Sequence, residues 1–376
     1  MSAIFIIGIF LAFFLMILLF SKKQKSVPDK ILAVWMLFIG LHLLSFFLYS
    51  LGYWDKYPHL VGIHHPFPLI YGPLLFLYTL YSLRSDQRFR KKDLLHFLPF
   101  LFSYIYMSPF LFTYTAEQKR ISDQMESDPG FHIYFMVSLI ALIVSGILYP
   151  ILSYRLIARY RRLIDENFAY KEGINLNWLQ MFITGIFSVY FVVAVFSALK
   201  WGFSVNFGFD PSYIFFSLIV LFVFFLGYFG IRQQDVFANP AVTKEIALPK
   251  AKTEYQNSGL KEEDARILHN KLKRLMLEEK PYLEPKLSLG NLAQQLSVSV
   301  NYLSQAINQC EGKNFHDFVN EFRVNEFIQA AKLPENKNYN ILGLAFDAGF
   351  NSKSSFNQIF KKQTGKTPSE FIRENL

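Results

Sequence analysis

Seven long apolar stretches fill the first 231 residues and constrain the fold more than any other feature of the chain. A helix that crosses the hydrocarbon core of a bilayer needs about 20 predominantly apolar residues. Each stretch comes close to that length, so the sequence predicts a bundle of seven transmembrane helices. The predicted spans are Ala3–Phe20, Ile31–Leu51, Pro66–Leu83, Leu94–Phe112, Phe131–Leu152, Trp178–Leu199 and Ser212–Ile231.

Lysine and arginine in the connecting segments predict how these spans are oriented. The first, third and fifth connections hold 14 of these residues, and the second, fourth and sixth hold 4. Positive loops face the cytoplasm, so the N-terminus is predicted outside and the C-terminus inside. Lys22, Lys23 and Lys25 follow the first stretch and no charge precedes it, which favours a retained helix over a cleaved signal peptide.

The last ninety residues contain two copies of one helical pattern. In the second copy, Ile341 to Gly365, apolar residues recur at helical spacing on both sides of Gly349. Glycine suits the left-handed residue that ends a helix, and Ser352 is a good N-cap for the next one. Gly365 fits the end of that second helix. Two short helices joined by a tight turn form a helix-turn-helix motif.

The first copy runs from Leu287 to Gly312, and a linking helix separates it from the second. Ser299 is its predicted N-cap, and Val300, Leu303 and Ile307 are predicted to be buried. The linking segment FHDFVNEFRVNEFIQAAKL has enough apolar residues for one continuous helix.

These motifs resemble the DNA-binding domain of AraC-type bacterial transcription regulators. The resemblance rests on NYLS in the first copy, GFNSKSSF and FKKQTGKTPSEF in the second, and the linking helix. It implies that the second helix of each copy enters a major groove of DNA. By position, the implied base-reading residues are Asn301, Ser304, Gln305, Lys353, Ser354, Asn357 and Gln358. The implied phosphate contacts are Lys313, Lys361, Lys362 and Lys366.

The chain departs from many AraC-type relatives at Gln305 and Gln358, where an arginine is common. Glutamine pairs best with adenine, and arginine pairs best with guanine. We therefore expect a preference for A·T pairs at the two steps that these residues read.

The expected fold class is all-α, in three parts. Residues 1–231 form the membrane domain, residues 232–285 form a linker with one amphipathic helix, and residues 286–376 form the DNA-binding domain. The linker helix lies in LKEEDARILHNKLKRLMLEEK. Its apolar stripe is predicted to be Ile267, Leu268, Leu272, Leu275 and Met276. This stripe needs a partner, and we expect it to pack on its own chain rather than on a second copy.

Composition and motifs argue against several other functions. The net charge of +9 lies mostly in the apolar half, so it is not a footprint of DNA binding. The single cysteine, Cys310, excludes an internal disulfide. The sequence contains no metal-ligand spacing, phosphate loop or catalytic constellation, and it therefore predicts neither an enzyme nor a bound cofactor.

The sequence thus predicts a regulator in the bacterial plasma (inner) membrane, with a membrane half that senses a signal. Its expected partners are double-stranded DNA, the lipid bilayer, RNA polymerase, a second copy of the chain and an unidentified small-molecule or peptide signal. An alternative is a transporter or channel-like protein with a regulatory DNA-binding tail. A third interpretation makes the membrane half a passive anchor.

Overall fold

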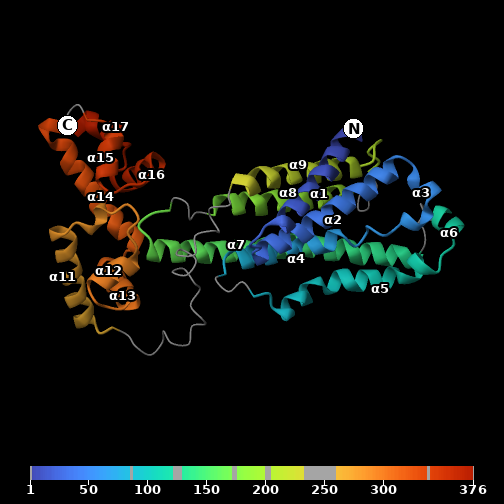
Figure 1. Cartoon of the computed structure of the whole chain (residues 1–376), viewed down its shortest axis with the longest axis horizontal. Coiled ribbons are helices and arrows are strands. Elements are labelled where there is room, and N and C mark those ends of the chain that lie inside the picture. Colours follow the sequence, from blue (N-terminus) through green and yellow to red (C-terminus); the bar gives the residue numbers. More distant parts are fainter. Residues whose placement is uncertain are drawn as a thin grey trace. The chain divides into compact units, whose positions relative to one another are not determined.

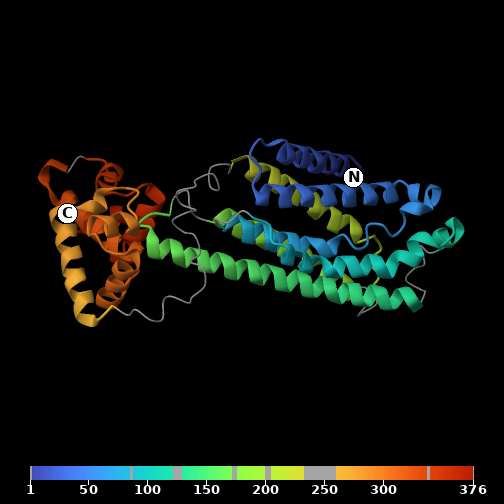
Figure 2. The same ribbon diagram turned by 60° about the horizontal axis from the view of Figure 1, so that its bottom comes forward.

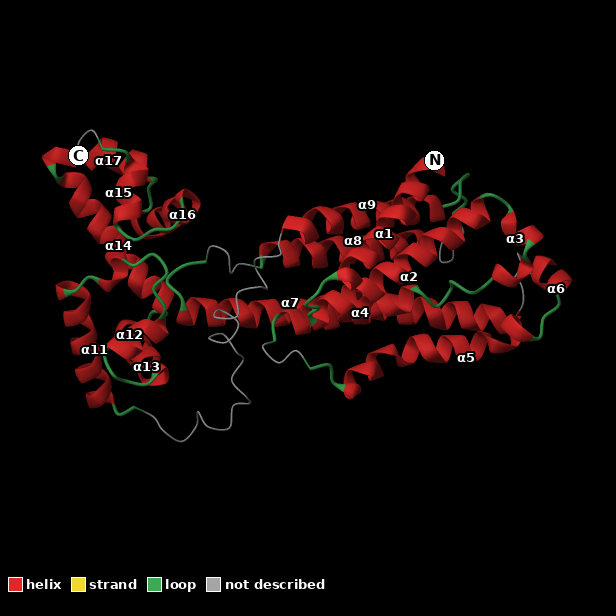
Figure 3. Cartoon of the chain, in the orientation of Figure 1, coloured by secondary structure: helices red, strands yellow, loops and turns green. Residues whose placement is uncertain are grey.

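The computed structural model describes residues 2–84, 88–121, 129–171, 176–199, 205–232, 260–336 and 339–375. Over these ranges the chain is all-α, as predicted, and its regular elements are helices (Figures 1 and 3). The chain divides into two compact units. The first contains Met1–Ile157 and Leu176–Ala238, and the second contains Ala158–Asn175 and Asn239–Leu376.

The first unit is built from apolar helices joined by short helical turns. Its longer helices are α1 (Ser2–Ser21), α2 (Val27–Ser50), α4 (Pro68–Ser82), α5 (Leu98–Phe112), α7 (Pro129–Asn167), α8 (Asn177–Ser197) and α9 (Ser212–Arg232). Its shorter elements are α3 (Tyr53–Lys56), η1 (Pro58–Leu60), η2 (Lys91–Phe97) and α6 (Ala116–Ile121).

Five of these helical segments, among the described residues, are long and apolar enough to cross a membrane. They are Ala3–Ser21, Val27–Ser50, Lys91–Phe112, Met136–Asn167 and Asn177–Ser197. The predicted third span forms α4, which has only 15 residues. The predicted seventh span is covered by the shorter apolar segment Ser212–Tyr228. The predicted count of seven spans is therefore not confirmed.

Glycines allow close approach between helices of the first unit. A Cβ atom added at Gly72 of α4 would lie 2.4 Å from Ser145 Oγ of α7. One added at Gly146 of α7 would lie 2.7 Å from the ring of Tyr190 on α8. Small residues at such crossings are typical of helix packing in membranes. Large apolar side chains point outward elsewhere, and Phe112 is 84% exposed.

Helix α7 is longer than the predicted span. The segment after Leu152 was expected to be part of a cytoplasmic loop, but the helix continues to Asn167 (Figure 2). Its added turns are rich in Arg, Leu and Ile, without proline or glycine to stop the helix. The two compact units meet along the chain within α7, between Ile157 and Ala158.

The second unit contains two small helical cores that share one helix. Its elements are α11 (Glu262–Glu278), η5 (Pro281–Leu283), α12 (Leu289–Gln295), α13 (Val300–Glu311), α14 (Phe315–Lys332), η6 (Pro334–Asn336), α15 (Ile341–Asp347), α16 (Lys353–Thr364) and α17 (Pro368–Asn375). Phe318 of α14 belongs to the first core, and Phe327 of the same helix belongs to the second. Helix α14 is therefore the predicted linking helix.

Helix α11 packs on its own chain, as predicted. Its buried residues Leu268, Leu272 and Met276 join the core of the first motif. Two details of the prediction are wrong, because Ile267 of α11 is 52% exposed and Val300 of α13 is 38% exposed. Val300 is the first residue of its helix, at the edge of the core. The predicted linker before α11 falls on residues 233–259, outside the described residues.

Candidate nucleic-acid interface

The turn of the second helix-turn-helix depends on Gly349. Its φ is +91°, and an added Cβ would lie 2.4 Å from the Tyr282 carbonyl oxygen. Only glycine combines that backbone conformation with so close an approach. The Ser352 side chain then accepts a hydrogen bond from Ser355 N and caps α16, and Gly365 ends α16 in the left-handed conformation. All three predicted roles are confirmed.

The first motif uses similar devices with a different turn. Ser299 caps α13 by accepting a hydrogen bond from Tyr302 N, and Gly312 ends this helix in the left-handed conformation. The turn residue with positive φ is Ser297, at +54°. Ser288 and Asn291 form a reciprocal capping box at the start of α12. Local side-chain hydrogen bonds thus fix the start of both helices in this motif.

Helix α16 presents all four of its predicted base-reading side chains to solvent. Lys353, Ser354, Asn357 and Gln358 are exposed on this helix. Its opposite face, formed by Phe356, Ile359 and Phe360, is buried in the second core. Helix α16 therefore has an exposed polar face opposite a buried apolar face.

Helix α13 presents its predicted residues less evenly. Asn301 is exposed, whereas Ser304 and Gln305 are half-buried. The Gln305 Oε1 atom accepts a hydrogen bond of 3.3 Å from Leu260 N, just before α11. The carbonyl oxygen of the Gln305 amide, which would accept a hydrogen bond from a base, is therefore already bonded within the chain.

Three of the four predicted phosphate contacts form ion pairs within the chain. Lys362 Nζ lies 2.9 and 3.0 Å from the two carboxylate oxygens of Asp317 on α14. Lys366 pairs with Glu374, and Lys313 pairs with Glu311 and Glu321. Lys361 is exposed. His316 and Lys362 together lower the pKa of the Asp317 carboxyl well below its usual range.

An ion cluster joins α11 to α13. The Glu311 carboxylate lies 2.8 Å from Lys273 Nζ and 2.9 Å from His269 Nε2. Hydrogen bonds from Lys273, His269 and Lys313 lower the pKa of Glu311 to about 2. Glu311 is therefore a carboxylate at neutral pH, and it holds the two helices together.

Sequence reasoning missed two buried polar residues of α14. Asn320 and Arg323 are 0% and 1% exposed, although they occur within the apolar pattern of the linking helix. Arg323 Nε donates to the Tyr282 carbonyl oxygen at 2.7 Å, and Nη2 donates to that of Glu284 at 2.8 Å. Polar residues interrupting an apolar face were the available signal, because buried polar groups need partners.

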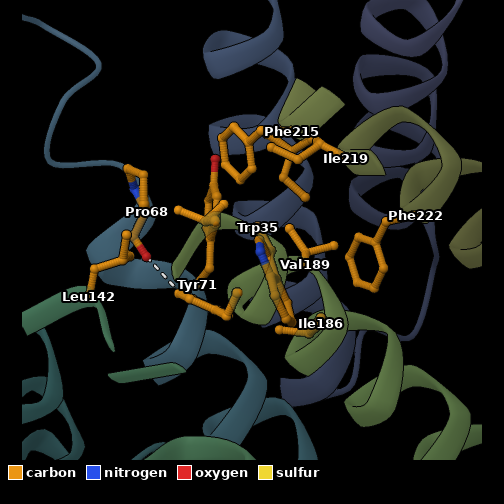
Figure 4. Close-up of a pocket in the computed structure, with 12 residues that line it drawn as sticks. Trp35, Pro68, Tyr71, Leu142, Ile186, Val189, Phe215, Ile219 and Phe222 are labelled. Carbon is orange, nitrogen blue, oxygen red and sulfur yellow. Dashed lines mark hydrogen bonds between the residues drawn. The ribbon is translucent and has the colours of Figure 1, made fainter. Parts of the chain in front are cut away.

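The first unit contains a cavity of about 40 Å³ between its helices (Figure 4). Its lining is almost entirely apolar. The lining residues are Trp35, Ile39, Pro68, Tyr71, Leu142, Ile186, Val189, Tyr190, Val193, Phe215, Ile219 and Phe222. Among the described residues, no group pairs with the buried Trp35 Nε1.

Two tyrosines of the cavity lining have polar partners. The Tyr71 hydroxyl lies 2.8 Å from His42 Nδ1, and the Tyr190 hydroxyl donates to the Pro68 carbonyl oxygen at 2.9 Å. The surface that faces the cavity is therefore apolar.

Comparisons with known proteins agree with the geometry of the second unit. A family model described as a helix-turn-helix domain matches residues 292–374. A protein of Proteus vulgaris, described as "Probable transcription factor PqrA", is 30% identical over 89 residues. The match covers 24% of this chain and 70% of that protein. No solved structure matches the chain at a significant level. With its two capped helix-turn-helix motifs, the chain belongs to the AraC-type family of DNA-binding transcription regulators.

Proposed function

We propose that the chain is a membrane-embedded, sequence-specific transcription regulator whose first unit senses a signal and controls its DNA-binding unit. One observation carries the proposal: five helices suited to crossing a bilayer share a polypeptide with an AraC-type domain. The excess of positive charge in alternate connections favours a cytoplasmic DNA-binding unit. An anchored domain can also find a second copy more readily, because anchoring raises its local concentration.

Helices α13 and α16 would read successive major grooves through the seven polar residues predicted from the sequence. The exposed face of α16 supports this role most strongly. Lys313, Lys362 and Lys366 would exchange their carboxylate partners for DNA phosphates, and Lys361 would contact phosphate directly. Such contacts orient the protein without reading sequence. RNA polymerase would be the partner through which the bound protein changes transcription.

The cavity around Trp35 is the proposed place for the signal. Its apolar lining and its volume of about 40 Å³ suit an apolar molecule of about three or four heavy atoms. Binding would matter only if the molecule favoured one arrangement of the helices over another. Ethanol and acetone are probes of about that size.

Deleting residues 1–231 tests the assignment of sensing to the first unit. Transcript profiles of cells with the full chain and the deleted chain would be compared, with each small alcohol or ketone present or absent. A sensor predicts a response that the deletion abolishes. A response that survives the deletion would contradict sensing by the first unit and would favour a passive anchor.

A topology measurement tests the membrane assignment. A reporter that is active only in the cytoplasm would be fused after Leu376, and one that is active only outside would be fused there in parallel. The proposal predicts activity from the cytoplasmic reporter alone. Activity from the external reporter would rule out access of this domain to DNA.

A further inference from the structure

The segment that follows α7 is docked on the DNA-binding unit. Phe168 forms an isolated antiparallel bridge with Ser288, the N-cap of α12. Ala169 N donates to the Leu287 carbonyl oxygen at 3.1 Å. Phe168 and Ala169 are each 1% exposed, and Ala169 belongs to the core of the first motif. We call residues Phe168–Tyr170 the docking segment.

Two buried side chains of α14 hold the docking segment from the other side. The Ala169 carbonyl oxygen accepts hydrogen bonds from Asn320 Nδ2 at 3.0 Å and from Arg323 Nη1 at 3.2 Å. Both main-chain polar groups of Ala169 are thus bonded to the DNA-binding unit. Buried backbone groups need such partners, and at Ala169 the DNA-binding unit supplies all of them.

Arg323 also reaches the second motif. Its Nε atom would lie 3.1 Å from a Cβ added at Gly349, the turn between α15 and α16. The same side chain binds the carbonyl oxygens of Tyr282 and Glu284. Asn351, two residues after the turn, donates to the Pro285 carbonyl oxygen at 3.0 Å. One guanidinium therefore lies against the docking segment, the chain before the first motif and the turn of the second.

We propose that the docking segment fixes the placement of α13 relative to α16, so that α7 transmits changes in the first unit to the spacing of the two recognition helices. The inference rests on the proposed function. Covalent continuity supplies the connection, because α7 begins in the first unit and ends at Asn167, one residue before the docking segment.

Release of the docking segment would take the Ala169 acceptor from one N–H of Asn320 Nδ2 and one N–H of Arg323 Nη1. The same two nitrogen atoms also bond the His316 carbonyl oxygen and Asn320 Oδ1. An unpaired buried donor costs more than the bond itself is worth, so Asn320 and Arg323 would rearrange instead of remaining in place. Rearrangement of Arg323 would loosen its contacts with the chain before α12 and with the Gly349 turn. Two recognition helices that are no longer held together bind paired half-sites less tightly, because preorganisation is lost.

The test measures spacing selectivity rather than affinity alone. Full-length protein in lipid nanodiscs would select its duplex from a random pool. Binding would then be compared between that duplex and one with two extra base pairs between its half-sites. Ala169→Pro removes the N–H that bonds Leu287, and we expect it to reduce the preference for the selected spacing about tenfold. The exposed Arg162, on α7 before the docking segment, supplies the control, and Arg162→Ala should keep the wild-type preference.

Asn320→Leu supplies a second variant from the opposite side of the contact. It removes the donor to Ala169, so it should lower spacing selectivity in the same direction as Ala169→Pro. In the double variant, the fold reduction in spacing preference should be smaller than the product of the two single-variant reductions, because both substitutions act on one contact. Binding of a duplex with a single half-site should stay within about threefold of wild type in each variant, which excludes simple unfolding.

The outcomes separate this inference from the proposed function. Wild-type protein that selects no duplex would contradict the proposed function itself. The role of the docking segment would be overturned by a different result. In that result the wild-type protein selects a duplex, and both variants keep its spacing preference or increase it.

Discussion

At the scale of single residues, Gln358 offers the sharpest test of base reading. It is exposed on α16, unlike Gln305, whose amide bonds Leu260 N. We expect Gln358→Arg to change the preferred base at one position from adenine to guanine, by about tenfold in relative affinity. Selection from a random duplex pool measures the change. Gln363→Arg adds the same charge to α16 and should raise affinity without changing the preferred base.

Gly349 tests the packing of the second motif. Gly349→Ala places a Cβ 2.4 Å from the Tyr282 carbonyl oxygen in a left-handed conformation. We expect it to lower the unfolding free energy of the DNA-binding unit by at least ~2 kcal/mol. Gly312→Ala is the matched control, because its φ is +65° and no atom lies within 4 Å of the added Cβ. Hydrogen exchange of α15 and α16 would compare the two variants, and Gly349→Ala should show the lower protection. Equal protection in both variants would contradict this role of Gly349.

At the scale of helices, Glu311 couples the stability of the α11–α13 pair to pH. Its carboxyl has a pKa of about 2 in the folded protein, below the ordinary value of 4.5. Because the pKa is lower in the folded protein, the ionised Glu311 stabilises the fold at every pH above 4.5. This stabilisation is lost as the pH falls from 4.5 toward 2. We expect Glu311→Gln to be less stable than wild type at neutral pH. The difference in unfolding free energy between wild type and Glu311→Gln should shrink as the pH falls from 4.5 to 2. Hydrogen exchange of α11 measures it. A difference that does not change with pH would contradict this role.

The helices that could be predicted from the sequence are those with local signals. Ser299, Ser352 and Gly365 each act within a few residues of their own position, so their roles followed from spacing. The left-handed conformation of Gly349 is local in the same way, but its close approach to Tyr282 is not. The docking of Ala169 on Asn320 joins residues 151 positions apart, and no local pattern encodes it. The continuation of α7 was missed because a positive segment between spans resembles a loop. The partial burial of Gln305 depends on Leu260, which the motif itself does not contain.

At the scale of the whole molecule, the chain joins two chemistries along one polypeptide. The first unit exposes large apolar side chains that suit contact with lipid, such as Phe10 at 69%. The second unit instead buries its apolar residues in two small cores and presents polar helices. Three covalent connections join the units, one within α7 between Ile157 and Ala158, one between Asn175 and Leu176, and one between Ala238 and Asn239.

Capture of DNA by isolated membranes tests the central claim most directly. Membrane vesicles bearing the full chain, with their cytoplasmic face outward, would be mixed with a labelled selected duplex and a scrambled duplex of equal length. The account predicts that the vesicles retain the selected duplex and release the scrambled one, and that vesicles lacking the chain retain neither. Equal retention of both duplexes, or recovery of the chain in the soluble fraction, would contradict it.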